Sequence, residues 1–140
     1  MDHYLVVARQ TLGSPTLMDI VRDRLSRGPS VFHLLVPATP DKGLVWDEGH
    51  AHVAAESALE EARLAYVAEG IPVTGEVGQA NPVYAVEKVL RRDGDDHYAE
   101  IIVSTLPSTV SKWLKADAPT RIRKLTRVPV THMEAVTASH

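Results

Sequence analysis

The stretch Tyr98-Ala-Glu-Ile-Ile-Val-Ser-Thr-Leu-Pro-Ser-Thr-Val-Ser-Lys112 decides the fold, because an apolar strand runs through a hydroxyl-rich turn into a segment of helical character. In a parallel α/β sheet, ligands bind just outside the carboxyl ends of the strands, where such turns lie. Hydroxyl groups, helix N–H groups and an ammonium group can together hold an anion there. The candidate anion-binding residues in this stretch are Ser104, Thr105, Ser108, Ser111 and Lys112.

These residues also have a purely structural interpretation. Ser108 would cap the helix that follows, Ser104 would face a tight turn, and Ser111 and Lys112 would be solvated. Hydroxyl side chains are common helix caps, so both interpretations stand at this point.

Apolar runs and helix signals alternate along the rest of the chain. Ser14-Pro15 and Asn81-Pro82 are typical of helix starts, with a capping side chain before a proline. The predicted strands cover residues 4–8, 31–36, 72–77, 100–103 and 128–133. The predicted helices begin at Ser14, His50, Asn81 and Ser108, and the last runs to residue 127 with a break at 117–119. The alternation predicts a single α/β domain over residues 1–140, a doubly wound parallel sheet with helices on both faces, and a disordered tail from about residue 134.

Composition limits the function classes. The chain has 140 residues, of which 44% are hydrophobic and 24% charged, and its formal net charge is −3. Because basic residues are not in surplus, we expect no nucleic acid partner. The absence of cysteine excludes disulfides and thiolate chemistry and fits a reducing compartment. The chain shows no leader pattern and no apolar run of about 20 residues, so we expect a cytoplasmic protein without a membrane partner.

The order and spacing of these segments resemble the universal stress protein family. Val6-Val7-Ala8 leads through a short turn to a Ser-Pro helix start, a long helix follows a loop, and Glu100-Ile-Ile-Val103 and Val128-Pro129-Val130 fit the last two strands. The resemblance implies a five-stranded sheet in the order 3-2-1-4-5. It also implies a stress-response role and, in many members, a dimer formed through the last strand.

The family's ATP motif is altered in this chain. ATP-binding members carry an aspartate at the end of the first strand, where this sequence reads Ala8-Arg9-Gln10. They also carry a glycine-rich phosphate loop after the fourth strand, and Thr105 and Ser108 stand near its first glycines. A β-carbon at such a position blocks close approach of the backbone to a phosphate. Asp117, near the final glycine pair, would repel a terminal phosphate by roughly 4 kcal/mol at about 4 Å. We therefore assign no cofactor and expect ATP to bind no better than in the high micromolar range.

The turn after the first strand provides further candidates. We expect it to face the Ser104 turn across the point where the strand order reverses. Arg9 would then bind a phosphate or a carboxylate, and the alternative is a solvated loop arginine. Gly78 would permit a backbone turn near a ligand or would serve the turn alone. These candidates are Ala8, Arg9, Gln10 and Thr11, together with Val36 and Gly78 at the ends of the second and third strands.

Histidines offer weaker candidates. Asp47-Glu48-Gly-His50-Ala-His52 holds metal-ligand residue types, but residues two apart do not share a helix face, so we predict no metal site. His33 is expected to be a core-strand residue whose nitrogens are satisfied locally.

The fifth strand is predicted to be an edge strand with little protection from pairing. No lysine or acid lies between Val128 and Met133, and pairing with the same strand of a second chain would cover its free N–H and C=O groups. The predicted interface of this homodimer contains Val128, Val130, His132 and Met133.

Three functional classes follow. The first is a non-enzymatic regulatory or stress-response protein that binds a nucleotide or another small anion weakly at the switch point of the sheet. The second is an enzyme of a related α/β fold that hydrolyses nucleotides or transfers nucleotidyl groups. The third is a structural dimer with a vestigial cleft. Fold alone does not choose among them.

Overall fold

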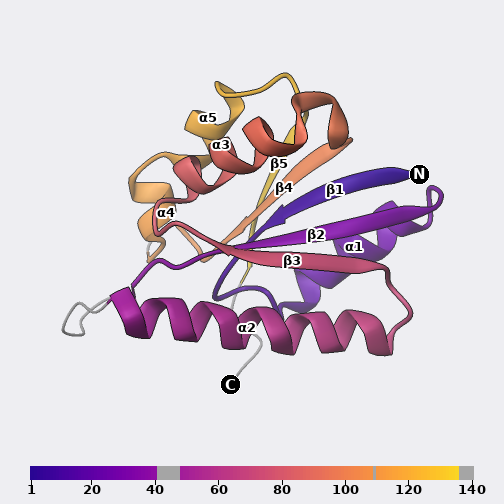
Figure 1. The fold of residues 1–140 in the computed structure, drawn as a ribbon, viewed down its shortest axis with the longest axis horizontal. Helices are drawn as coiled ribbons and strands as arrows, with labels where there is room; N and C mark the ends of the chain where they lie inside the picture. Colours follow the sequence, from indigo (N-terminus) through magenta and orange to yellow (C-terminus); the bar gives the residue numbers. More distant parts are fainter. Residues whose placement is uncertain (41–47, 109, 136–140) are drawn as a thin grey trace.

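The computed structural model describes residues 1–40, 48–108 and 110–135. In these ranges the chain alternates strands and helices as the sequence predicts (Figure 1). The strands are β1 (Asp2–Val7), β2 (Ser30–Pro37), β3 (Val73–Gly78), β4 (Glu100–Thr105) and β5 (Val130–Glu134). The helices are α1 (Pro15–Leu25), α2 (Glu48–Ala68), α3 (Pro82–Asp93), α4 (Lys112–Lys115) and α5 (Ala118–Arg123), with a short 3₁₀ turn η1 (Asp95–His97).

The five strands form one parallel sheet in the order β3-β2-β1-β4-β5, which confirms the predicted fold class. β1 lies at the centre of the sheet, with Leu5 beside His33 of β2 and Ile101 of β4. The strand order reverses between β1 and β4, so the carboxyl ends of these two strands diverge into loops on opposite faces. This is the position at which ligands bind in open α/β sheets.

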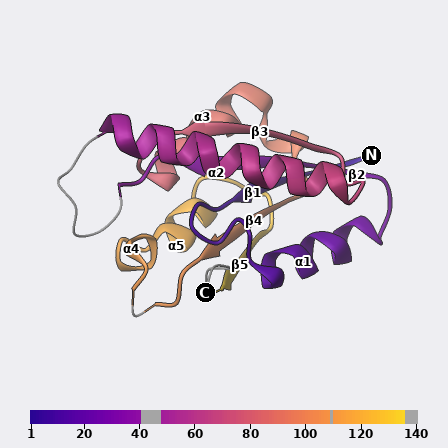
Figure 2. The ribbon, with the colours of Figure 1, turned by 90° about the horizontal axis from the view of Figure 1, so that it is seen from below.

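Helices cover both faces of the sheet, and each face has its own core. Figure 1 shows α2 below the sheet and α3 and α5 above it, and Figure 2 shows α1 and α2 from below. Alternate residues of β1 serve the two faces, since Val6 packs in the core under α1 and α2 while Leu5 and Val7 pack in the core under α3 and α5. This explains the unbroken apolar run of the strand, because both faces are buried.

The predicted helix starts are confirmed at α1 and α3. The Ser14 hydroxyl accepts a hydrogen bond from the Thr16 amide at 3.1 Å, and Asn81 Oδ1 accepts one from the Val83 amide at 2.9 Å. A proline follows each cap, where the helix needs no donor.

The segment after β4 differs from the single broken helix that the sequence predicts. The helix does not begin at Ser108 but at Lys112, and α4 is one turn long. The predicted break is present, because Asp117 adopts a left-handed conformation (φ 57°) and Pro119 lies in the first turn of α5. β5 extends through Glu134, and Ala135 is buried, while the remaining residues of the predicted tail lie outside the described ranges.

A buried ion pair joins α1 to the sheet. Arg24 donates to both carboxylate oxygens of Glu100, from Nε at 2.6 Å and from Nη2 at 3.0 Å, and the Thr131 hydroxyl also donates to that carboxylate. Burial raises the pKa of Glu100, but the hydrogen bonds from Arg24 and Thr131 outweigh it, so the pKa lies below its usual value.

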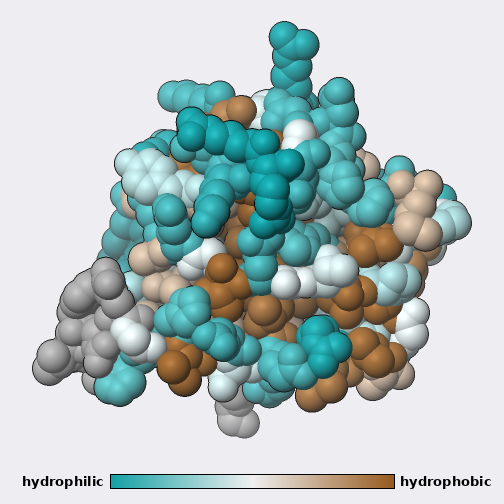
Figure 3. Space-filling view, viewed as in Figure 1, coloured by the Kyte–Doolittle hydropathy of each residue, from teal (hydrophilic) through white to brown (hydrophobic). Residues whose placement is uncertain are grey.

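The outer surface of the molecule is mixed. Figure 3 shows apolar residues along the side where α2 runs, and Val53, Leu64 and Val67 of that helix are exposed. No helix in the described part of the chain is both long enough and apolar enough to span a membrane.

Candidate functional site

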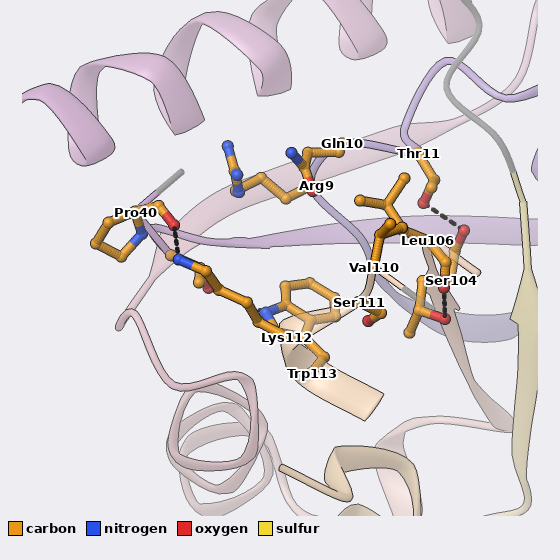
Figure 4. Close-up of a pocket in the computed structure, with 12 residues that line it drawn as sticks. Arg9, Gln10, Thr11, Pro40, Ser104, Leu106, Val110, Ser111, Lys112 and Trp113 are labelled. Carbon is orange, nitrogen blue, oxygen red and sulfur yellow. Dashed lines mark hydrogen bonds between the residues drawn. The ribbon is translucent and has the colours of Figure 1, made fainter. Parts of the chain in front are cut away.

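A cleft of about 200 Å³ opens at the carboxyl ends of β1 and β4, at the switch point of the sheet. Its walls come from the loop after β1, the loop after β2, the end of β4 and the start of α4 (Figure 4). The lining residues are Arg9, Gln10, Thr11, Thr39, Pro40, Ser104, Thr105, Leu106, Val110, Ser111, Lys112 and Trp113.

The structure brings seven of the predicted site residues together at this cleft. The predicted turn after β1 faces the predicted turn after β4, because the two strands are neighbours. The predicted residues that line the cleft are Arg9, Gln10, Thr11, Ser104, Thr105, Ser111 and Lys112. The structure shows that these residues lie together, and their role in binding stays a prediction.

Four other candidates lie elsewhere. Ala8 and Val36 are fully buried in the core under α1 and α2, so they position the loops without reaching the cleft. Gly78 ends β3 where an added β-carbon would approach Ala85 Cβ and Leu35 Cδ1 to 2.9 Å, so its smallness serves the packing of α3 on the sheet. Ser108 faces β5 instead.

Ser108 is not the helix cap that the structural interpretation expects. Its amide donates a hydrogen bond to Glu134 Oε1 at 2.8 Å, so a carboxylate from β5 already occupies an N–H group of the loop after β4. The cap of α4 is Ser111, whose hydroxyl accepts from the Leu114 amide at 3.2 Å, and Ser111 is buried rather than solvated. Thr109, between them, lies outside the described residues.

The hydroxyl groups at the cleft form hydrogen bonds with one another and with other groups of the protein. Thr11 Oγ1 and Ser104 Oγ lie 2.5 Å apart, and both residues are buried. Thr105 Oγ1 donates to the Leu106 carbonyl at 2.9 Å and lies 2.9 Å from His132 Nε2. Because the hydroxyl has only one proton, His132 Nε2 must be the donor in the second contact. Burial lowers the pKa of His132, and the charge of Glu134 opposes that shift.

Two cations give the cleft its charge. Lys112 is exposed and its Nζ donates to the Pro40 carbonyl at 3.1 Å, while Arg9 is half-buried and approaches from the loop after β1. Figure 4 shows both side chains extending toward the Pro40 side of the cleft. The described lining residues include no carboxylate and no histidine, so the local charge is positive although the whole chain carries −3.

Sequence reasoning missed the residues that come from the loop after β2 and the apolar wall. Trp113 is 8% exposed, and its Nε1 donates to Thr39 Oγ1 at 3.1 Å. Leu106, Val110 and Pro40 complete this wall. A tryptophan directly after the candidate Lys112 was the available signal, because indole rings that combine an apolar body with one donor are common at binding surfaces.

The histidine and metal expectations have different outcomes. His33 Nδ1 lies 2.7 Å from Thr74 Oγ1 and its Nε2 lies 2.6 Å from Glu76 Oε2, so its nitrogens are satisfied locally, as predicted. His52 Nε2 lies 2.8 Å from Glu56 Oε1 on the same helix. Asp47 lies outside the described residues, and within them no group of three or more metal-ligating side chains converges.

No protein-family model and no curated protein matches this sequence. Among solved structures, the chain is similar to a protein from the universal stress protein family from Burkholderia pseudomallei, with a TM-score of 0.54 over 96% of both chains. The sequences are 16% identical over that range. The similarity is therefore one of fold: the chain has a universal-stress-protein-like fold over nearly its whole length.

Proposed function

We propose that this protein is a non-enzymatic regulatory protein of the universal stress type that binds a small anion at the switch point of its sheet. One observation carries the proposal: Arg9 and Lys112, from segments far apart in the sequence, reach the same cleft at the carboxyl ends of β1 and β4. Charge-assisted hydrogen bonds from two cations are strong enough to select an anion. The fold similarity supports the stress-response assignment.

The contacts around the cleft favour a small anion over a triphosphate. The Ser108 amide is bonded to Glu134, and the buried hydroxyls of Thr11 and Ser104 are bonded to each other. The donors of this amide and of the two hydroxyls are therefore already used within the protein, which leaves the charged side chains of the cleft as the main groups that could attract a phosphate. This agrees with the weak ATP binding that the altered motif predicts.

The residues that line the cleft favour binding over catalysis. General acid–base catalysis needs a titratable side chain within hydrogen-bond reach of the reacting group. The described lining residues offer only Arg9 and Lys112 as charged groups, and neither guanidinium nor ammonium groups titrate near neutral pH as a general acid or base usually does. A nucleotide-hydrolysing activity of the purified protein would contradict this part of the proposal.

Calorimetry with inorganic phosphate, pyrophosphate and Mg-ATP tests the proposal directly. Lys112→Ala should weaken phosphate binding about tenfold or more, because a hydrogen bond to a charged group contributes about 1.5–3 kcal/mol. Lys115→Ala is the matched control, since Lys115 lies on the same helix, is exposed and does not line the cleft. Equal effects of the two variants, or no binding of any anion, would reject the cleft as the site.

We also propose that two chains associate through β5. β5 pairs only with β4 within the described sheet. The bonds from the Ile101 amide to the Pro129 carbonyl and from the Ala135 amide to the Thr105 carbonyl imply, by alternation, that the backbone groups of Val130 and His132 face away from β4. Val128 and Met133 are buried within the two cores, and the half-buried Val130 also packs against the core under α3 and α5, so the interface should be centred on the outward backbone groups of Val130 and His132.

Light scattering tests this assembly. The protein should be a dimer at micromolar concentration, and Val130→Asp should give a folded monomer because a carboxylate would lie at the pairing edge. A monomeric native protein would reject the dimer, as would a Val130→Asp variant that is still dimeric.

A further inference from the structure

We infer that the ligand is a small aromatic molecule with one anionic group, whose ring lies against Trp113 and whose acid group is held by Arg9 and Lys112. The inference rests on the proposed anion binding and names the class of ligand. It depends on the position of the indole ring, on the apolar residues around it, and on the size of the cleft.

Trp113 is held in place by a chain of hydrogen bonds. Its Nε1–H donates to Thr39 Oγ1, and the Thr39 hydroxyl donates in turn to the Ala80 carbonyl at 2.5 Å. These bonds join α4 to the loop after β2 and to the loop after β3. Because the polar edge of the indole is satisfied on the protein side, the part of the ring that lines the cleft is apolar.

The indole has apolar neighbours that together form one wall. Figure 4 shows its ring near the centre of the labelled residues, with Lys112 on one side and Val110 on the other. Leu106 and Pro40 also line the cleft, and Val110 is 51% exposed at its opening. An inorganic anion would leave this wall in contact with water, whereas a flat apolar group would cover it.

The size of the cleft limits the ligand. Pockets that enclose drug-sized molecules measure about 300–1,000 Å³, and this cleft measures about 200 Å³. An apolar cavity of about 150 Å³ is large enough for benzene. A single aromatic ring with one acid substituent therefore fills the cleft, and a nucleoside triphosphate exceeds it.

The charges specify one acid group. Arg9 and Lys112 are the charged residues of the described lining, and both extend toward the same side of the cleft. A carboxylate or a phosphate monoester offers oxygens to both cations at once. Further phosphates would find the Ser108 amide occupied by Glu134.

The probes for the test share an acid group and differ in the ring. Phenyl phosphate, cyclohexyl phosphate, inorganic phosphate and Mg-ATP are titrated by calorimetry into the full chain. Phenyl phosphate should bind about tenfold or more tightly than inorganic phosphate, because stacking on an indole adds to the burial of apolar area. Cyclohexyl phosphate should lie between them, and ATP should bind more weakly than phenyl phosphate.

Variants of the residues in the apolar wall test where the ring of the ligand binds. Trp113→Leu should reduce phenyl phosphate binding to the level of inorganic phosphate. Because Trp113 is buried, a second pair of variants at the exposed Val110 guards against loss of folding. Val110→Asp should weaken the binding of every anion about tenfold or more through charge repulsion, and Val110→Asn should not. In a Trp46→Phe background, Trp113 is the sole tryptophan, and its indole N–H signal in NMR spectra should shift with phenyl phosphate.

The outcomes separate this inference from the proposed function. If anions bind through Lys112 but the ring adds nothing, or if ATP binds most tightly, the ligand class is wrong and the proposed anion binding stands. If no anion binds, both are wrong. If Val110→Asp leaves every affinity unchanged, the ligand does not lie in this cleft.

Discussion

Thr11 Oγ1 and Ser104 Oγ lie 2.5 Å apart, and this contact joins the loop after β1 to the carboxyl end of β4. Each residue is 1% exposed, so neither hydroxyl has water as a substitute partner. The pair therefore links two segments that line the cleft.

Removing either hydroxyl should destabilise the protein. Thr11→Val and Ser104→Ala should each lower the free energy of unfolding by about 1–3 kcal/mol, because the remaining hydroxyl is buried without its partner. The double variant should cost less than the sum of the two, as measured by urea denaturation. Thr16→Val, at an exposed position, serves as the control. Additive losses would show that the two hydroxyls do not act together.

The ion pair between Arg24 and Glu100 should be costly to break and inexpensive to replace. Glu100→Gln should lower the free energy of unfolding by about 3 kcal/mol, because it removes the buried negative charge that balances the largely buried Arg24 guanidinium and leaves it with the more exposed Asp23 carboxylate. The double variant Arg24→Met, Glu100→Leu should lose less than Glu100→Gln alone. Glu60→Gln, in the exposed pair with Arg63, should change stability by less than about 1 kcal/mol.

The buried hydroxyl of Tyr66 should lower the free energy of unfolding. Tyr66 is 1% exposed, and within the described chain no atom forms a hydrogen bond with its hydroxyl. Burial raises the pKa of this phenol, and the charge of Glu69 adds to the shift. Tyr66→Phe should therefore raise the thermal midpoint, with a gain of about 1 kcal/mol from an unpaired hydroxyl that is no longer buried.

Tyr98→Phe is the matched control for that experiment. Tyr98 is also buried, but its hydroxyl donates to Asp93 Oδ2 at 2.5 Å. The same chemical change should lower stability there. A loss of stability in both variants would show that Tyr66 has a partner in solution.

Asp93 should make stability depend on pH in acid. Hydrogen bonds from Arg92 lower the pKa of Asp93 to about 2, with burial opposing and the Tyr98 hydroxyl assisting. Since its pKa in an unfolded chain is about 3.9, the stabilisation is complete above about pH 4 and is lost as the pH falls toward 2. The difference in unfolding free energy between the native protein and Asp93→Asn should therefore shrink over that interval. A constant difference would contradict the assignment.

Local signals predicted the framework of this protein well. The caps Ser14 and Asn81 act within two residues of their own positions, and alternating apolar runs determine which strands are buried on both faces. The topological rule for parallel sheets then brought Arg9 and Ser104 together. Each of these inferences needs only near neighbours or the order of the elements.

The missing part of the site depends on contacts between distant segments. Thr39 reaches Trp113 across 74 residues of sequence, and Glu134 reaches Ser108 across 26. A helix signal also could not show that Ser111, rather than Ser108, would become the cap, because the Ser108 amide bonds to a carboxylate that is distant in the sequence. The contact between the Thr11 and Ser104 hydroxyls could not be predicted for the same reason, because the two residues are 93 positions apart in the sequence.

The carboxylate of Glu134 accepts a hydrogen bond from the Ser108 amide, and it therefore competes with any dissolved anion for that N–H group. A tethered group acts at an effective concentration that reaches about millimolar even for a flexible link, and Glu134 is held in a strand of the sheet. A dissolved anion must outcompete that carboxylate before it can use the amide. If an anion binds here as we propose, it would have to be selected by the side chains of the cleft and not by this amide.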